Sequence, residues 1–309
     1  TLTSSSSYTV DENQTDIGEI TASDEDGDSV TFTISGETAI SVNEANDRII
    51  FNTAPDYEAQ STYSPTLTVS DGTDSTSENI TVNISDVNEA PVFTSRSTFE
   101  GNENQTAIGS LLEEFPYIVS ASDPEGGSVR YSLSSNSGLA ITSDGVLTFI
   151  TAPDYETKSS YIGSVTVSDG NLSTTQSITV TVNNLNDNAP TFTSSSSFSA
   201  AENQTSIGTV TATDPDGNLN VITYSVSGSE LSITSVGVLS FVTAPDYETK
   251  STYTATVTAS DGTNSSTQDI TVSVTDENDA PTFKTGATFT NTENSIAIGT
   301  ILVRDSESD

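Results

Sequence analysis

The sequence repeats itself along its whole length, and this repetition restricts the possible folds more than any other feature. The motif ENQT, or its variant ENSI, occurs at intervals of 91, 99 and 91 residues, beginning at Glu12, Glu103, Glu202 and Glu293. The motif APDYE recurs in the same order, beginning at Ala54, Ala152 and Ala244. A period of this length matches one small domain. We therefore expect complete repeats over residues 1–90, 91–189 and 190–280, and the start of a fourth over 281–309.

Within each repeat, apolar residues alternate with Ser and Thr, as in Val30–Gly36, Ser177–Asn184 and Asp269–Asp276. This alternation is typical of half-buried strands, and no segment has a sustained helical period. In the third repeat it predicts seven strands, over residues 196–201, 208–213, 221–228, 231–234, 237–243, 252–260 and 269–275. A hydrophobic content of only 32% would also fit disorder, but the regular alternation favours an all-β chain of tandem β-sandwiches.

The second repeat is eight residues longer than its neighbours (99 against 91), because of an insertion around residues 111–118. The insertion contains apolar and aromatic residues, among them Phe115 and Tyr117. Two interpretations are open: the loop folds onto its own domain, as such loops usually do, or it offers a contact surface.

The charge of the chain is strongly one-sided. Seven Lys and Arg residues stand against 44 Asp and Glu residues, which gives a formal charge of −37. Such a chain repels nucleic acid and anionic membrane surfaces, and it attracts cations. Because the sequence has no Cys and no His, it offers a metal only oxygen ligands, which disfavours zinc and copper. No apolar run is long enough to span a bilayer, so we expect no membrane insertion within this segment.

The acidic residues recur at fixed positions in each repeat. They are the glutamate of ENQT, the Asp and Glu of DYE, an Asp-x-Asp/Glu turn, an SDG turn, and the linkers between repeats. A solvated acidic surface, as in a halophilic protein, would instead place them on outward strand positions. Clustered like charges cost stability unless a cation neutralises them. The pattern therefore predicts cation sites, and calcium suits carboxylate, amide and carbonyl oxygens best.

Four motifs in a fixed order resemble those of cadherin repeats. They are the upstream Glu-Asn pair, the DYE triplet, the DPDG turn, and the linkers DVNEAPVF, NLNDNAPTF and DENDAPTF at residues 86–93, 184–192 and 276–283. The resemblance covers three complete repeats and the fragment, and it looks closest to the repeats of large bacterial surface proteins. It implies Greek-key, seven-stranded, immunoglobulin-like β-sandwich domains arranged end to end, in an extracellular protein of the cell surface. It also implies up to three Ca²⁺ at each junction.

In that family calcium lies between successive domains, and this implies the ligands. The first junction would use Glu12, Asp56, Glu58, Asp86, the Val87 carbonyl, Asn88, Glu89, Asp123, Glu125 and Asp169. The second would use Glu103, Asp154, Glu156, Asn184, Leu185, Asn186, Asp187, Asp214, Asp216 and Asp261. The third would use Glu202, Asp246, Glu248, Asp276, Glu277, Asn278, Asp279, Asp305 and Glu307. The downstream half of a further site, which we expect to stay empty without its upstream half, would be Asp24, Asp26 and Asp71.

The second junction differs from the others, because Asn184 stands where they have Asp86 and Asp276. The missing carboxylate predicts that one calcium position there is weaker or absent. At every junction, the carboxylates should repel one another across a short, Pro-containing linker when metal is absent. Bound metal should fix the orientation of successive domains and make the chain a rod.

Catalysis is not expected, although Asp56 and Glu58 resemble the paired acids of a glycosidase. This pair recurs in every repeat, which is unusual for a catalytic pair, and the commonest general base, His, is absent. The tyrosines of the DYE triplets could line a sugar-binding face, but packing beside the ion sites is the favoured interpretation. Without Trp the chain cannot use the inserted tryptophan by which vertebrate classical cadherins adhere.

We therefore expect a calcium-binding structural or adhesion protein, whose repeats form a surface spacer that mediates attachment between cells or to surfaces. The alternative is a self-assembling subunit of a surface layer or extracellular filament. Glycan recognition by the repeats would need an aromatic platform, for which the insertion with Phe115 and Tyr117 is the candidate. The expected partners are other copies of the chain, other surface proteins or glycans, and no nucleic acid.

Overall fold

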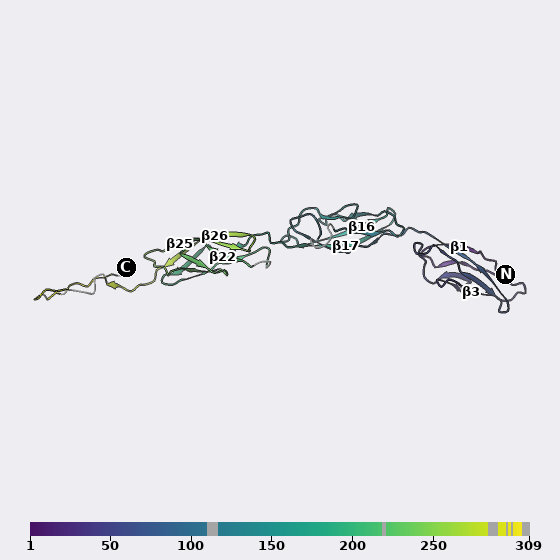
Figure 1. Cartoon of the computed structure of the whole chain (residues 1–309), viewed down its shortest axis with the longest axis horizontal. Coiled ribbons are helices and arrows are strands. Elements are labelled where there is room, and N and C mark those ends of the chain that lie inside the picture. Colours follow the sequence, from purple (N-terminus) through teal and green to yellow (C-terminus); the bar gives the residue numbers. More distant parts are fainter. Residues whose placement is uncertain (110–116, 218–220, 284–289, 295, 298, 305–309) are drawn as a thin grey trace. The chain divides into compact units, whose positions relative to one another are not determined.

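The computed structural model describes residues 1–109, 117–217, 221–283, 290–294, 296–297 and 299–304 (Figure 1). These residues form strands, turns and loops, and no helix among them could cross a membrane. The chain divides into two compact units. One comprises Thr1–Gly101, Gln105–Ala152 and Ser160–Thr181, and the other comprises Asn102–Asn104, Pro153–Ser159 and Val182–Asp309. This division runs within the predicted second repeat, and the repeat boundaries stay a prediction.

The first repeat is built of short, mostly antiparallel strands. They are β1 (Ser7–Asp11), β2 (Asp16–Glu19), β3 (Thr31–Ser35), β4 (Ile40–Asn43), β5 (Arg48–Phe51), β6 (Thr62–Tyr63), β7 (Thr66–Ser70), β8 (Ser75–Asn79) and β9 (Thr81–Ser85). They form sheets in the orders β1-β9-β6, β3-β7-β8 and β2-β5-β4. Strand β1 runs parallel to β9, so the start and the end of the repeat lie side by side.

The second repeat has a four-stranded sheet in the order β11-β17-β16-β13 and the hairpin β14-β15, with the pair β10-β12 beside them. Its strands are β10 (Val92–Phe93), β11 (Thr98–Asn102), β12 (Ala121–Ser122), β13 (Arg130–Leu133), β14 (Leu139–Ile141), β15 (Leu147–Phe149), β16 (Ser160–Ser168) and β17 (Ser173–Asn183).

The third repeat has the sheets β19-β26-β25-β22 and β20-β24-β23 and the pair β18-β21. Its strands are β18 (Thr191–Phe192), β19 (Ser197–Ala201), β20 (Ser206–Thr209), β21 (Ala212–Thr213), β22 (Thr223–Val226), β23 (Leu231–Ile233), β24 (Val238–Phe241), β25 (Thr252–Ser260) and β26 (Ser265–Thr275). In the remaining segment β27 (Thr282–Phe283) pairs with β28 (Val303–Arg304).

Side chains from both sheets of a repeat share one apolar core. In the third repeat Leu239 and Phe241 of β24 lie buried in the same cluster as Val257 of β25 and Val272 of β26. The rings of Phe241 and Tyr253 meet edge to face, with centroids 5.0 Å apart, and the first and second repeats have equivalent pairs. Alternating strands therefore bury one face each between two sheets, which confirms the predicted all-β sandwich fold.

Proline explains why the long strand β25 of the third repeat corresponds to two short strands, β6 and β7, in the first. Pro65 separates β6 from β7, because it has no N–H to donate to a strand ladder. Its carbonyl accepts a hydrogen bond of 2.9 Å from Ile80, the residue that separates β8 from β9. In the third repeat Ala255 lies two residues after Tyr253, as Pro65 follows Tyr63, and β25 is continuous there.

One predicted strand of the third repeat is wrong as a single element. Residues 208–213 divide between β20, which pairs with β24, and β21, which pairs with β18. Between them the backbone N–H of the buried Val210 donates instead to the carbonyl of Gly237, at 2.9 Å. This contact with the turn before β24 moves the chain from one sheet to the other.

The insertion of the second repeat lies mostly outside the described residues, which begin again at Tyr117. The Tyr117 ring is buried, lies 5.9 Å from the Phe99 ring, and carries the Arg96 guanidinium over its face. Its ring therefore packs onto its own domain and is not available as a sugar platform. Phe115 lies outside the described residues.

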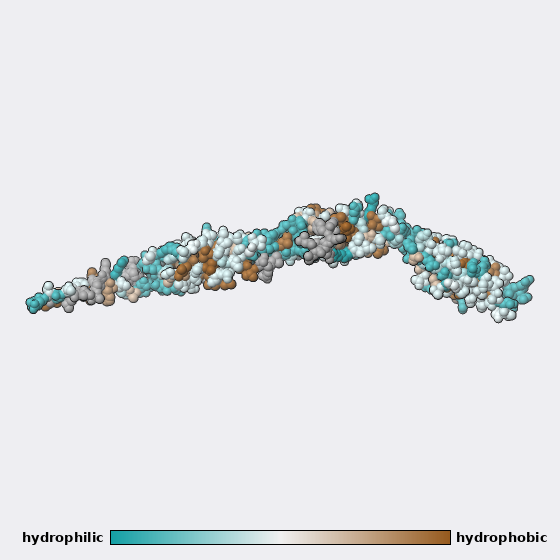
Figure 2. Space-filling view, in the orientation of Figure 1, coloured by the Kyte–Doolittle hydropathy of each residue, from teal (hydrophilic) through white to brown (hydrophobic). Residues whose placement is uncertain are grey.

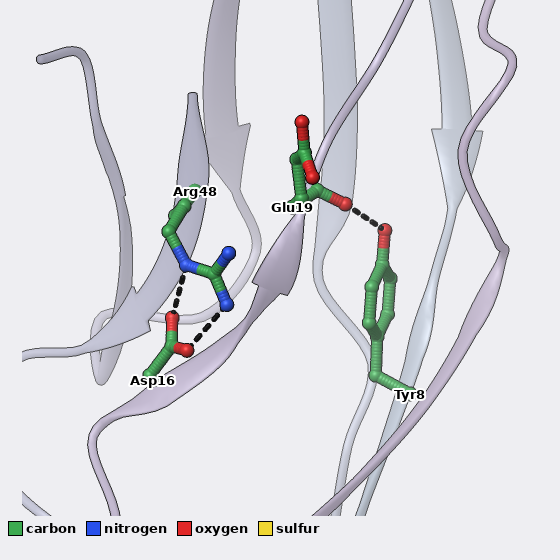
Figure 3. A network of polar contacts seen from close by, with 4 residues as sticks. All are labelled: Tyr8, Asp16, Glu19 and Arg48. Atoms are coloured by element: carbon green, nitrogen blue, oxygen red, sulfur yellow. Dashed lines mark hydrogen bonds and ion pairs between the residues drawn. The ribbon is translucent and has the colours of Figure 1, made fainter. Parts of the chain in front are cut away.

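Strand β2 of the first repeat is held on both sides by side chains (Figure 3). Arg48 of β5 forms a two-point ion pair with Asp16, and its Nε lies 2.6 Å from Asp16 Oδ1. On the other side the Tyr8 hydroxyl donates to the Glu19 carbonyl, at 3.3 Å. The Tyr8 ring lies over Gly18, where an added Cβ would come within 2.8 Å of it.

Residues of intermediate to low hydropathy, pale to teal, cover most of the visible surface, with small groups of hydrophobic residues between them (Figure 2). The exposed apolar side chains include Ile150, Ile162 and Val242. Such scattered residues are ordinary for a folded protein.

Candidate metal centres

Each complete repeat buries one glutamate directly after a strand that lies beside the repeat's last strand, and this pairing is parallel for β1 and β19. The exposed fractions of these residues are only 1%, 2% and 3%, for Glu12, Glu103 and Glu202. One carboxylate oxygen accepts a hydrogen bond of 2.8 Å from the backbone N–H of the DYE tyrosine, namely Tyr57, Tyr155 or Tyr247. The other accepts one of 2.7–2.9 Å from the linker N–H of Val87, Leu185 or Glu277. The glutamate thus joins the DYE loop to the linker.

The asparagine after each buried glutamate adopts a left-handed backbone conformation. Its φ is 62°, 61° and 60°, at Asn13, Asn104 and Asn203. Its N–H donates to the carbonyl of the proline in APDYE, at 2.9–3.0 Å, namely Pro55, Pro153 and Pro245. Asparagine tolerates this conformation better than most residues. The sequence motif therefore encodes a tight turn that brings the ENQT and APDYE loops together.

Carboxylates gather in groups of three at these loops. Within each group one oxygen per residue lies within 4.8 Å of the others, and the groups are Glu12–Asp56–Glu58, Glu58–Asp86–Glu125, Glu103–Glu156–Asp187, Glu202–Glu248–Asp276 and Asp214–Asp216–Asp261. The second group joins acids from the first repeat, its linker and the second repeat. All the members were predicted as ligands.

Crowding of like charges affects the protonation of these acids. Desolvation, followed by repulsion from Glu12, raises the pKa of Glu58. Desolvation, and then repulsion from Asp216, raises the pKa of Asp214. A nearby cation would offset the repulsion at both residues, because it favours the ionised form of each carboxyl group.

The downstream ligands are arranged by turns that use one carboxylate oxygen. In each SDG turn Oδ1 of the aspartate accepts two backbone N–H groups at 2.6–2.8 Å, at Asp71, Asp169 and Asp261. The backbone N–H of Asn171 and then the Asn88 amide lower the pKa of Asp169. In the DPDG turn Asp214 Oδ1 accepts the N–H of Asp216 at 3.0 Å. Each aspartate keeps its second oxygen for another partner.

Several predicted ligands carry a buried oxygen without a hydrogen-bond partner in the described residues. They are Asp123 Oδ2, Glu125 Oε2, Asn184 Oδ1 and Asp214 Oδ2. A buried acceptor without a partner costs free energy. These oxygens are hard ligands of the type that calcium binds, so the donor set fits the ion.

The first two linkers contact the downstream repeats directly. In the first, the N–H of Glu89 donates to Glu125 Oε1 at 2.6 Å, and the Asn88 amide donates to Asp169 Oδ2 at 2.8 Å. In the second linker, Asn188 and Asn186 make equivalent contacts, with Asp216 Oδ2 and Thr263 Oγ1, both at 2.9 Å. In the third linker the Asn278 amide makes a contact within the linker itself, to the carbonyl of Asp279 at 3.1 Å.

Other predicted ligands lie apart from the groups of three. Asp154 and Asp246 accept backbone N–H groups within the DYE turn, from Thr157 and Thr249. The half-site residues Asp24, Asp26 and Asp71 line one surface pocket beside Thr1. Asp305 and Glu307 lie outside the described residues. Asn188, an additional residue of the second linker, was not predicted as a site residue. Its amide lies 2.8 Å from both Asp187 Oδ1 and Asp216 Oδ1.

Comparisons with known proteins match two of the repeats to known domain families. A cadherin-domain model matches residues 196–275, and a bacterial Ig-domain model matches residues 88–183. Cadherin-related family member 1 of Xenopus laevis is 28% identical over 262 residues, which cover 76% of this chain and 30% of that protein. Chitinase A of Pseudoalteromonas piscicida is 34% identical over 151 residues, which cover 48% of this chain and 17% of that protein. The chain thus spans less than a third of either relative.

Solved structures with a similar fold are also cadherin domains. The structure of mouse cadherin-23 EC22-24 aligns with a TM-score of 0.56 at 22% sequence identity, covering 88% of this chain and 96% of that one. These findings confirm the resemblance that the linker and turn motifs indicate. The third repeat thus matches cadherin domains and the second matches bacterial Ig domains, and the chain has the fold of tandem cadherin domains.

Proposed function

We propose that the chain is a calcium-stiffened spacer within a larger extracellular adhesion protein. The observation that carries this proposal is the set of buried, unpartnered oxygens at the ends of the repeats, on Asp123, Glu125, Asn184 and Asp214. Three of these are carboxylate oxygens and one is an amide oxygen, and calcium binds both kinds. Its partners in adhesion are other copies of the chain, other surface proteins or glycans.

Calcium would supply positive charge shared by ligands of successive repeats. At the first junction Glu58 and Asp86 would hold it from the upstream side, and Glu125 from the downstream side, because their oxygens already converge. Without the ion these carboxylates repel one another, and the linker is free to swivel. The role is structural, since the same acids recur in every repeat.

The test measures calcium binding to the whole chain by calorimetric titration, and its conformational distribution by small-angle scattering. We expect saturable binding, and narrower conformational distributions in calcium than in excess chelator. Asp214→Asn should weaken binding, because it removes a buried carboxylate charge. The matched control is Glu78→Gln, whose side chain is exposed on β8 and distant in sequence from every predicted ligand of the second junction. Absence of binding, or identical scattering in calcium and chelator, would refute the proposal.

A further inference from the structure

The inference concerns the asparagine of the Glu-Asn pair, and it rests on the proposed calcium function. A left-handed backbone at this position explains why the residue would be asparagine or glycine. Glycine adopts such angles at lower cost. The sequence nevertheless has asparagine in all three complete repeats, at Asn13, Asn104 and Asn203. Backbone conformation alone therefore does not account for the side chain.

The side-chain amide makes the same contact in each repeat. It donates to the last acid of the linker that follows, about one repeat further along the chain. Asn13 Nδ2 lies 2.7 Å from Glu89 Oε1, and Asn203 Nδ2 lies 3.2 Å from Asp279 Oδ1. Asn104 makes the equivalent bond to Asp187. The contact persists although the first linker has Glu where the other two have Asp.

The contact holds an acid beside other acids of the same charge. In the second repeat Asp187, which Asn104 contacts, also lies in the group with Glu103 and Glu156, whose oxygens are within 4.8 Å of one another. An amide N–H that donates to a carboxylate offsets part of the repulsion and restricts the side chain before any ion binds. The acid keeps lone pairs on both oxygens for a cation.

We infer that Asn13, Asn104 and Asn203 are positioning residues for the calcium junctions. Each acts through the last acid of its linker, which its amide orients toward the cation, and does not itself bind the ion. The backbone of the same residue is bonded to the APDYE proline, so the amide is fixed with respect to the buried glutamate. Deleting the amide should therefore weaken calcium binding without unfolding the repeat.

The test uses the full chain with the triple substitution Asn13→Gly, Asn104→Gly and Asn203→Gly. Glycine keeps the left-handed backbone and removes only the amide. We expect the mean calcium dissociation constant to rise roughly tenfold, as the loss of a charge-assisted hydrogen bond would cause. In excess chelator the melting temperature should change little, because the lower cost of glycine in the left-handed backbone opposes the loss of the hydrogen bond. The matched control is Asn136→Gly, at a left-handed residue (φ 68°) outside the predicted junctions, which should leave the dissociation constant unchanged.

A second triple variant, Asn13→Asp, Asn104→Asp and Asn203→Asp, keeps the size of the side chain and replaces its donor with a carboxylate. Weaker calcium binding in this variant supports the inference, because the linker acid would then be repelled. Tighter binding would overturn it, since the position would then act as a ligand. If the unmodified chain binds no calcium, the proposed function itself fails. If the unmodified chain and the glycine variant bind equally, the positioning role alone fails.

Discussion

At the scale of single residues, the buried glutamates carry the most structural information. Glu202 is almost fully buried, and its two oxygens accept backbone N–H groups of Tyr247 and Glu277, at 2.8 and 2.9 Å. Two charge-assisted bonds offset much of the cost of burying the charge, while Glu248 and Asp276 nearby oppose it. The residue is therefore both a structural link and a member of the acidic group.

Substituting Glu202→Gln separates these two roles. The amide retains one acceptor oxygen, but its NH₂ group faces the second backbone N–H, so one buried donor loses its partner. We expect the free energy of unfolding in chelator to fall by about 1–3 kcal/mol. Urea denaturation measures this change, with Glu78→Gln, an exposed residue of β8, as the control. Unchanged or greater stability would mean that relief of repulsion outweighs the lost hydrogen bond.

The ion pair between Asp16 and Arg48 predicts that stability depends slightly on pH. The cause here is attraction between opposite charges and not repulsion between like charges. The hydrogen bond from Arg48 lowers the pKa of Asp16. A lowered folded-state pKa adds stability above the ordinary Asp pKa of about 3.9, and this stability is lost as the pH falls through the lowered value. Asp16→Asn should therefore cause a small loss of stability at neutral pH, because the Asp16 side chain is 55% exposed and solvent screens the pair.

Measurement of that difference by urea denaturation in chelator, at neutral pH and again in acid, checks the sign. The two proteins should become equally stable in acid. A difference that persists in acid would indicate that the substitution perturbs the backbone of β2 instead of removing a charge pair.

Some of the site residues could be identified from the sequence and others could not. Glu12, Glu103 and Glu202 recur within short motifs, so their spacing alone indicates a shared role. The side-chain contacts of the asparagines that follow these glutamates could not be predicted, because the contact between Asn13 and Glu89 spans 76 residues. Only the parallel pairing of the first and last strands brings such positions together, and no local pattern encodes that distance.

At the scale of elements, Gly237 precedes β24 at the turn that approaches Val210. Its φ is 89°, and an added Cβ would lie 2.2 Å from the Val210 carbonyl oxygen. Gly237→Ala should therefore lower the free energy of unfolding by about 2 kcal/mol or more, through backbone strain and displacement of the carbonyl. Gly228, with a φ of 84° and no atom within 4 Å of an added Cβ, is the matched control in the same repeat.

Urea denaturation of Gly237→Ala and Gly228→Ala checks this expectation. The control shares the left-handed backbone, so it should lose only the part of the stability that strain explains. Equal losses would show that the close approach of Val210 contributes nothing.

The strand boundaries could be predicted from the sequence pattern in some places and not in others. Predicted residues 252–260 match β25, because alternating apolar residues pair along its full length. Strand β26, in contrast, begins at Ser265 and not at residue 269. Its first four residues are polar and none of them is buried, so they lack a buried face, and pairing with β25 extends the strand. Tertiary pairing therefore overrides local composition at this edge.

At the scale of the whole molecule, the repeat and the resemblance to cadherin domains were evident from the sequence because they depend on recurring motifs. The meaning of the charge of −37 depends on where the acids lie. A uniformly acidic surface is destabilised by repulsion that any salt screens, with a Debye length of about 8 Å at physiological ionic strength. Discrete sites respond instead to the one cation that fits them.

These two explanations give different responses to salt, and melting temperatures of the full chain distinguish them. We expect millimolar CaCl₂ to raise the melting temperature well above its value in chelator, because each site occupied at a hundredfold excess over its dissociation constant adds about 2.7 kcal/mol. NaCl at matched ionic strength should give a far smaller rise. MgCl₂ should fall between them, since magnesium gives up its water reluctantly and demands octahedral geometry. Equal rises in all three salts would mean that screening of a general acidic surface, and not ligation at the junctions, stabilises the chain.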